Sequence, residues 1–492
     1  MKKILGSLVV AVALWAGTTA FIGTQIEKNL QQQINHTNNL YTEYGIQYKL
    51  NNYKKSFFTS KAEVEIKITD PMMLELLKES VKLPIILDYE VEHGPIFLKN
   101  GLSLGAVQIH KELALSSLLK DEAKKEFLTL LKDDIKITND ISISFNKNAS
   151  YNIVSDAIKV DKDGQSFTMS PLSIKGNSNI ETFKGDTHLN IPSLTFTENK
   201  TQNGIKIENL LMNINIEEFI ENALMLGTID VTADKLMIKD DENPPLSQVD
   251  IALKLQMKNE KDTPTSINSI MEGDIDFKDT KLPASFPQLK NLHAKVDVKS
   301  LGIKGMIEFQ QASKEMQEAQ KELFSNMGNK SSSKDFEAKF TAFQKIQEKM
   351  VDKIIHALNS LLIKDKSTIS YAINIQTKDN KESKVSTDVH YIGDIEFKGK
   401  MEEVAMKVQE QALDLVNLNV NLTLNKEHVK SFPDAEKLNQ QIQMGVKQGF
   451  VKETNENYLL NGYYKNRELI VNDNNLTSII LPFLMMATQA GH

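Results

Sequence analysis

Strict alternation of apolar and polar residues marks several stretches of the chain as β-strands. A short run at 64–68 alternates in this way, and longer runs do so at 249–257, 369–375 and 418–424. Successive side chains of a strand point to opposite faces, so a period of two predicts one buried face and one face in water. Because parallel sheets are covered on both faces, the alternation predicts an antiparallel sheet.

Two dipeptides that lie between alternating runs predict hairpin turns. They are Asp163-Gly164 and Asn203-Gly204. Tight hairpin turns need residues with positive φ, and Asp-Gly and Asn-Gly adopt such φ values at little steric cost. Each dipeptide is therefore expected to join two neighbouring antiparallel strands.

Apolar residues at spacings of three and four predict helices at three places. A helix is expected over 118–131 and a short one over 216–225. The strongest signal covers 306–362, where Gly328, a residue type that commonly ends a helix, separates two apolar stripes. This segment is expected to form a helical hairpin whose stripes pack on each other and on the sheet.

The N-terminal residues are typical of a membrane anchor. The first three residues include two lysines and precede an uncharged run at 4–26, which is long enough to cross a bilayer as a helix. The lysines are expected to stay in the cytoplasm, with the rest of the chain on the outer side. The alternative is a cleaved signal peptide, although 18–20 is a poor cleavage site and the apolar run continues past it.

Together these patterns predict an α+β protein built mostly of antiparallel sheet with packed helices. A single transmembrane helix at 1–26 is followed by a β-rich lobe at 27–305 and by the helical hairpin at 306–362. A second β-rich lobe at 363–492 ends in an apolar helix. The part of the chain after residue 26 is therefore expected on the outer side of the membrane.

Composition narrows the class of protein further. The 492 residues are 40% hydrophobic and 25% charged, which is ordinary for a chain that buries a core. A net charge of -7 argues against a nucleic-acid partner, and a mean hydropathy of -0.32 excludes a polytopic membrane protein. The chain has no cysteine, which excludes disulfides, thiolate metal sites and a cysteine nucleophile.

Three segments resemble elements of a known family. They are 53–60 before the first clear strand, 88–95 at the end of an apolar strand, and 464–473 before the apolar tail. With the N-terminal anchor, their order resembles that of the YdgA-like family of bacterial inner-membrane-anchored proteins, a family of unknown function. The candidate motif residues are Tyr53, Phe58, Ser60, Glu92, His93, Gly94, Pro95, Tyr464 and Asn472.

The chain departs from the family pattern at four positions. Lys55 replaces an arginine and Ser56 a glycine in the first element, and Arg467 and Asp473 replace two glycines in the last. The aromatic and apolar skeleton of the elements is kept. The resemblance implies a location in the cell envelope, with the anchor in a bacterial inner membrane and most of the chain, including the lobe at 27–305, in the periplasm. It implies no known reaction.

The only histidine in a suggestive setting is His93, which follows Glu92 and precedes a Gly-Pro pair. One interpretation makes Glu92 and His93 an acid/base pair or two metal ligands. Neighbours on a strand point to opposite faces, however, so the favoured interpretation is a turn with the imidazole bonded to backbone. No other arrangement matches a metal, nucleophile or phosphate-binding motif. We therefore predict no catalytic, cofactor-binding or metal-binding residues.

The leading functional hypothesis is a non-enzymatic envelope protein that acts by binding or scaffolding. Its expected partners are the inner membrane, through the N-terminal helix, and either other envelope proteins or a second copy of the chain. One alternative is the handling of lipid or acyl chains in an apolar groove, because amphipathic sheets have an apolar face that something must cover. Another alternative is an envelope hydrolase that uses Glu92 and His93.

Overall fold

The computed structural model describes most of the chain after residue 44. The described ranges are 45–56, 59–97, 103–131, 133–198, 203–221, 224–240, 248–281, 286–325, 353–393, 414–431 and 434–478, with residues 34–35, 38, 341, 345–346, 349–350, 404 and 411 between or before them. The predicted anchor at 1–26, the motif residue Phe58 and the apolar tail beyond 478 lie outside the described residues.

The chain divides into two compact units. Unit 1 comprises residues 1–219 and 320–331, and unit 2 comprises 220–319 and 332–492. The division falls inside the β-rich lobe expected at 27–305, and the predicted lobe boundaries stay predictions. In both units the paired strands run antiparallel, which confirms the sheet-rich fold class.

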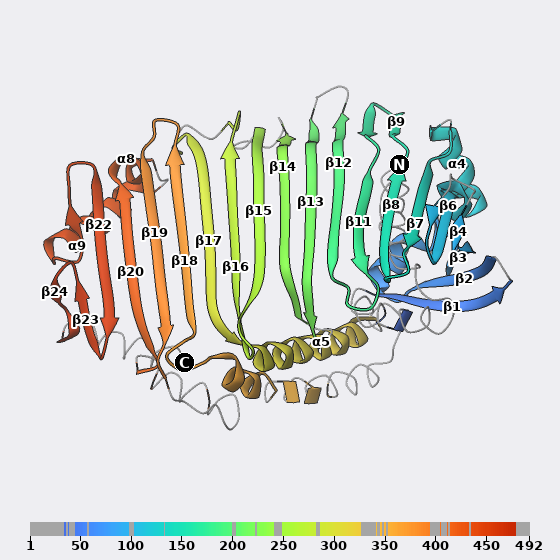
Figure 1. The fold of residues 1–492 in the computed structure, drawn as a ribbon. Helices are drawn as coiled ribbons and strands as arrows, with labels where there is room; N and C mark the ends of the chain where they lie inside the picture. Colours follow the sequence, from blue (N-terminus) through green and yellow to red (C-terminus); the bar gives the residue numbers. More distant parts are fainter. Residues whose placement is uncertain are drawn as a thin grey trace. The chain divides into compact units, whose positions relative to one another are not determined.

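Unit 1 is a meander of antiparallel strands (Figure 1). β8 and β9 act as one interrupted strand, as do β10 and β11, because β12 pairs along both β10 and β11. Its strands are β1 (Ile46–Lys55), β2 (Thr59–Ile68), β3 (Ile85–His93), β6 (Val107–Ala114), β7 (Lys136–Ile143), β8 (Asn148–Ser155), β9 (Ile158–Lys162), β10 (Gln165–Met169), β11 (Ser173–Asn179), β12 (Gly185–Glu198) and β13 (Gly204–Ile220), with a small pair β4 (Ile96–Phe97) and β5 (Ser103–Leu104).

The core of unit 1 lies on one face of this meander. Val64 and Ile66 of β2 are buried there, as the alternation predicts. The predicted helix over 118–131 is confirmed as α4 (Asp121–Leu131), which buries Phe127 and follows the short η2 (Leu115–Leu118). Two helical turns of α3 (Pro71–Leu77) bury Leu77 in the same core.

The two predicted hairpin turns have different outcomes. Asp163 and Gly164 have φ values of 53° and 74° and join β9 to β10, which confirms the first turn. Gly204 instead pairs with Thr197 as the first residue of β13. The connection between β12 and β13 is therefore longer than a two-residue turn, and the second prediction is wrong in this detail.

The predicted helix over 216–225 is wrong, because β13 extends through Ile220 and β14 follows. The period-two alternation of apolar residues that begins at Leu210 continues through Ile216, which pairs with Gly185 of β12. Backbone pairing along a 17-residue strand outweighs the helical spacing of a few apolar residues, since propensity is a weak signal beside tertiary context.

Unit 2 is a second antiparallel meander, in which β20 pairs with β22 rather than with β21. The alternating runs at 249–257, 369–375 and 418–424 lie in β15, β18 and β20, as predicted. Its strands are β14 (Leu224–Lys239), β15 (Gln248–Thr263), β16 (Ser266–Phe277), β17 (Leu289–Gly302), β18 (Thr368–Thr377), β19 (Glu382–Tyr391), β20 (Val416–Asn425), β21 (Lys452–Glu453), β22 (Asn457–Lys465), β23 (Glu468–Val471) and β24 (Asn474–Asn475).

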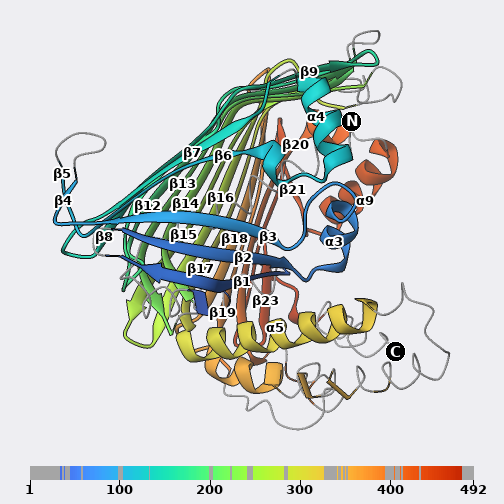
Figure 2. The ribbon, with the colours of Figure 1, turned by 90° about the vertical axis from the view of Figure 1, so that its right-hand side faces the viewer.

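Helices cover the ends of these strands. The first residues of α5 (Ile303–Ser325) lie across the ends of β14, β16 and β17, where Ile303 and Ile307 pack with Leu224 and Ile267 (Figures 1 and 2). Two further helices, α8 (Lys426–Lys430) and α9 (Ala435–Lys447), follow β20.

The described parts of the predicted helical hairpin lie side by side. Residues 353–361 are helical, and Lys353 forms an ion pair with Glu315 of α5. The close approach depends on Gly305, because a Cβ there would lie 2.3 Å from the backbone nitrogen of Leu361. The connection at 326–340 lies outside the described residues, so the complete hairpin stays a prediction.

Candidate functional site

One face of the sheet in unit 2 is apolar across seven strands, from β14 to β20. Directly opposed residues form two rows that cross the strands. Every position in the rows is apolar, aromatic, glycine or threonine, and we call this set the apolar face. One row is Ile229, Met257, Met271, Val296, Tyr371, Thr387 and Val420, and the other is Val231, Leu255, Gly273, Ala294, Ile373, Val385 and Leu422.

The middle of the apolar face is open to solvent. Met271 is 57% exposed, Leu255 43% and Tyr371 42%. Along β18 the usual relation is inverted, because Ile369, Tyr371 and Ile373 are exposed while Ser370, Ala372 and Asn374 on the other face are half-buried. The packed clusters of unit 2 that α5 and residues 353–361 join lie at the strand ends. A contiguous exposed apolar surface is typical of a binding site.

The opposite face of the same strands is polar. β16 places Glu272, Asp274 and Asp276 there, and β17 places His293 and Lys295 opposite them. A shallow cleft of about 330 Å³ on this side is lined by Lys254, Asp274, Asp276 and Asn291, among others. The two faces therefore differ in chemistry, and the pattern of the apolar one is not a consequence of a generally apolar sheet.

Three of the sequence-predicted motif residues meet at one end of the sheet in unit 1. The Tyr53 hydroxyl donates a hydrogen bond to Ser60 Oγ over 2.7 Å, and Ser60 Oγ lies 2.8 Å from His93 Nε2. The contact arises from strand register, because Ser60 of β2 pairs with Val91, two residues before His93 and on the same face of β3. Ser60 is buried, so this cluster ties β1, β2 and β3 together.

Glu92 lies on the other face of β3 from His93. It lines a cleft of about 570 Å³ with Gln108, His110 and Asp140. The structure therefore does not bring Glu92 and His93 together as an acid/base pair, which agrees with the alternation argument made from the sequence.

The glycine and proline that follow His93 shape a close chain crossing. The Gly94–Pro95 peptide bond is cis. A Cβ on Gly94 would lie 1.7 Å from the carbonyl oxygen of Gly105, so only glycine fits this position. The backbone nitrogen of Gly94 donates to the carbonyl oxygen of Ala106 over 2.9 Å.

The last motif element is also held by internal contacts. The Asn472 side-chain nitrogen donates to the carbonyl oxygens of Phe450 and Leu459 over 3.0 and 3.2 Å, and its oxygen accepts from the backbone nitrogen of Asn461 over 3.0 Å. Tyr464 is buried between β20 and β23, and burial raises the pKa of its hydroxyl. Both residues stabilise the end of the sheet.

Residues 1–478 match a family of bacterial proteins of unknown function, DUF945. The chain belongs to this family. The match covers all of unit 1, unit 2 up to residue 478 and all three motif elements. No curated protein and no solved structure matches this chain. Among the helices that the structure describes, none is both long and apolar enough to cross a membrane.

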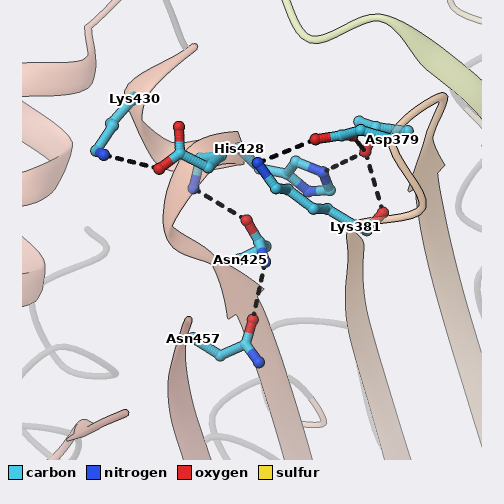
Figure 3. Close-up of polar contacts among 8 residues, drawn as sticks. Asp379, Lys381, Asn425, His428, Lys430 and Asn457 are labelled. Carbon is cyan, nitrogen blue, oxygen red and sulfur yellow. Dashed lines mark hydrogen bonds and ion pairs between the residues drawn. The ribbon is translucent and has the colours of Figure 1, made fainter. Parts of the chain in front are cut away.

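This DUF945 chain also holds a polar cluster in unit 2 that no sequence pattern predicts (Figure 3). The His428 side chain on α8 is buried, with Nδ1 2.6 Å from Ser383 Oγ. Its Nε2 lies 3.4 Å from Thr377 Oγ1, which donates to Asp379 over 2.5 Å. Burial lowers the pKa of His428. The hydrogen bond from Thr377, together with Lys381, lowers the pKa of Asp379 to about 2.

The His428 cluster fastens α8 to the strand ends. Ser383 Oγ also accepts from the backbone nitrogen of Asn425 over 2.9 Å, and Asn425 caps α8 through Glu427 N. The serine is thus occupied by structural contacts on two sides. Thr377 and Ser383 lie close together in the sequence, but His428 follows Ser383 by 45 residues, so no local spacing indicates the cluster.

Proposed function

We propose that this DUF945 protein is a non-enzymatic, membrane-anchored envelope protein that binds the acyl chains of lipids on the apolar face of unit 2. The observation that carries the proposal is the exposure of Met271, Leu255 and Tyr371 in the middle of that face. Covering such side chains with hydrocarbon is favourable by about 25 cal/mol for each Å² removed from water.

The size of the apolar face suits an acyl chain. Neighbouring strands lie about 4.8 Å apart, so seven strands give a width of about 30 Å. The hydrocarbon core of a bilayer, which contains two opposed acyl chains, is also about 30 Å thick. A single chain that lies across the strands therefore fits within the face.

The chemistry of the face favours lipid over a protein partner. Protein interfaces are rich in aromatic residues and arginine at their centres and have polar rims that form hydrogen bonds. The two rows contain one aromatic residue, Tyr371, and no charged residue. Methionine at 257 and 271 adds unbranched, polarisable side chains that adapt to flexible ligands.

The location in the envelope is part of the same proposal. The uncharged run at 4–26 and the resemblance to YdgA-like inner-membrane proteins support a single anchor with the rest of the chain in the periplasm. An anchor would hold the apolar face beside a supply of lipid. A reporter that is active only in the cytoplasm, fused after His492, should be silent, and an active reporter would reject this topology.

Co-purification tests the binding directly. Full-length protein is purified from a bacterial host in mild detergent and examined by native mass spectrometry, with organic extraction of any bound lipid. We expect bound lipid in the natural protein and at least a tenfold loss in Tyr371→Lys, because a charge on the face must be desolvated.

Ser370→Lys is the matched control. Ser370 precedes Tyr371 on the polar face, between Asp297 and Asp388, where a lysine is readily paired. This variant should keep its lipid. If both variants keep the lipid, the apolar face is not the binding site. If the natural protein carries no lipid and instead co-purifies with an envelope protein or a second copy of itself, a scaffold replaces the proposal.

A further inference from the structure

We propose that Glu272, Asp274 and His293 form a site for a divalent transition metal, with Zn²⁺ as the matching ion. The site lies on the polar face of β16 and β17 in unit 2, opposite the apolar face. It is independent of lipid binding, since its residues belong to the other side of the sheet.

The three side chains converge because of strand register. Asp274 of β16 and His293 of β17 are directly opposed, and Glu272 lies two residues before Asp274 on the same face. One potential ligand atom from each residue lies within 4.8 Å of the other two, and His293 Nδ1 is 2.9 Å from Asp274 Oδ1. In the described part of the chain, no other three histidine or acidic residues converge in this way.

Two oxygen acceptors around the site lack partners within the structure. Glu272 forms no hydrogen bond or ion pair among the described residues, although Lys295 is its direct neighbour on β17. Asn374 of β18 lies directly opposite His293, and its side-chain oxygen is buried with no hydrogen-bond partner. A buried unpaired acceptor costs free energy, and a cation beside it would remove that cost.

The donor set selects the kind of metal. Imidazole nitrogen suits Zn²⁺ and other transition metals, while carboxylates alone favour Mg²⁺ or Ca²⁺. Zinc accepts nitrogen and oxygen donors at about 2.0–2.2 Å in a tetrahedral arrangement. Small side-chain movements would bring the three donors to these distances and leave a fourth position for water or for the Asn374 oxygen.

An ion can reach the site from solvent, because His293 and Asp274 are partly exposed. The side chains of His293 and Asp274 are 30% and 35% exposed, and the adjoining cleft is lined by Asp274.

His110 in unit 1 offers a natural comparison. It contacts Asp140 over 2.6 Å, again across two paired strands, but no second carboxylate among the described residues converges on the pair.

Equilibrium dialysis of the full-length protein in detergent against Zn²⁺, followed by metal analysis, tests the proposal. One Zn²⁺ per chain is expected at micromolar free metal. Glu272→Gln and His293→Gln should each weaken binding about tenfold or more, whereas His110→Gln should not. Replacing Zn²⁺ with Co²⁺ should give the intense visible absorption of a four-coordinate ion, and His293→Gln should abolish it.

Glu272→Gln keeps the test informative if His293→Gln fails to fold, because Glu272 has no hydrogen-bond or ion-pair partner to lose among the described residues. Circular dichroism in the presence of a chelator confirms the folding of each variant. Two outcomes overturn the proposal. One is no binding by the natural protein, and the other is binding that Glu272→Gln leaves unchanged, which would assign the zinc to other surface groups.

Discussion

Arg467 and Asp473 hold backbone conformations that ordinary side chains resist. Their φ values are 63° and 70°, each at the second position of a turn that begins with asparagine. The YdgA-like pattern has glycine at both positions, and glycine is the residue that adopts positive φ without steric cost. Arg467 donates two hydrogen bonds of 2.6 Å to Asp414, which partly offset the steric strain. These bonds also lower the pKa of the Asp414 carboxyl.

We expect Asp473→Gly to stabilise unit 2. Relief of the left-handed conformation should add about 0.5 kcal/mol or more to the free energy of unfolding, since this region costs about 1–2 kcal/mol for most residues and less for aspartate. Denaturant unfolding measures the change. Glu468→Gly, in the neighbouring strand β23, is the control and should destabilise by about 0.5–1 kcal/mol. Equal destabilisation by both changes would contradict this account.

His428 should make unit 2 sensitive to acid. Burial lowers the pKa of His428 in the folded chain. The histidine of the unfolded chain is protonated near pH 6.5, whereas in the folded chain it is protonated only at lower pH. Stability is therefore full above about pH 6.5 and falls as the pH decreases through the window below it, by at most about 1.4 kcal/mol per pH unit.

His428→Gln should flatten this dependence, because glutamine keeps hydrogen-bonding groups but does not titrate. Unfolding measured between pH 7.5 and 5 would show it. Ser383→Ala, which removes a hydroxyl partner and leaves the imidazole, should lower stability while the pH dependence persists. An unchanged pH slope in His428→Gln would refute the role of this histidine.

The sequence predicts the relative position of two side chains only where both lie on the same strand. The divergence of Glu92 and His93 follows from alternation along β3 alone. The contact between Ser60 and His93 depends on the register of β2 against β3, and the convergence of Glu272 with His293 depends on β16 against β17. Register is not encoded in a local spacing, so the sequence did not reveal either cluster.

At the scale of elements, long alternating runs predicted strands well and short helical spacings did not. The run at 369–375 is fully contained in β18, where nine successive pairs with β19 fix it. The helix expected at 216–225 rested on local spacing alone, and the segment instead continues β13, which pairs with β12 through Ile216. The helix expected at 118–131 is present as α4, whose apolar stripe buries Ala123 and Phe127 in the core of unit 1.

The contact between α5 and residues 353–361 should be sensitive to a single methyl group. Gly305→Ala places a Cβ within 2.3 Å of the Leu361 backbone, which has little freedom to move. We expect a loss of about 1–3 kcal/mol in thermal or denaturant unfolding, the usual cost of overpacking. Lys304→Ala, at the preceding exposed position, should change stability by less than about 0.5 kcal/mol. A neutral Gly305→Ala would show that the helices do not pack so closely.

For the whole molecule, alternation predicted two chemically different faces but not what covers them. A period of two is the same whether helices fill the apolar face or leave it open. In unit 1, α3 and α4 help to cover it, and Val64 and Phe127 are buried. In unit 2, α5 lies at the strand ends and Met271 and Leu255 remain exposed. The open face is a property of three-dimensional placement, and it is the basis of the proposed function.

Site-specific photocrosslinking tests the central claim most directly. A photoreactive phenylalanine derivative is placed at position 371 on the apolar face or at position 370 on the polar face, and the full-length protein is irradiated in the membranes of its bacterial host. Adjacent residues of β18 point to opposite faces, so the two variants differ only in the surface they sample. We predict lipid adducts, identified by mass spectrometry, at 371 and not at 370. Protein adducts at 371, or equal lipid labelling at both positions, would contradict the account.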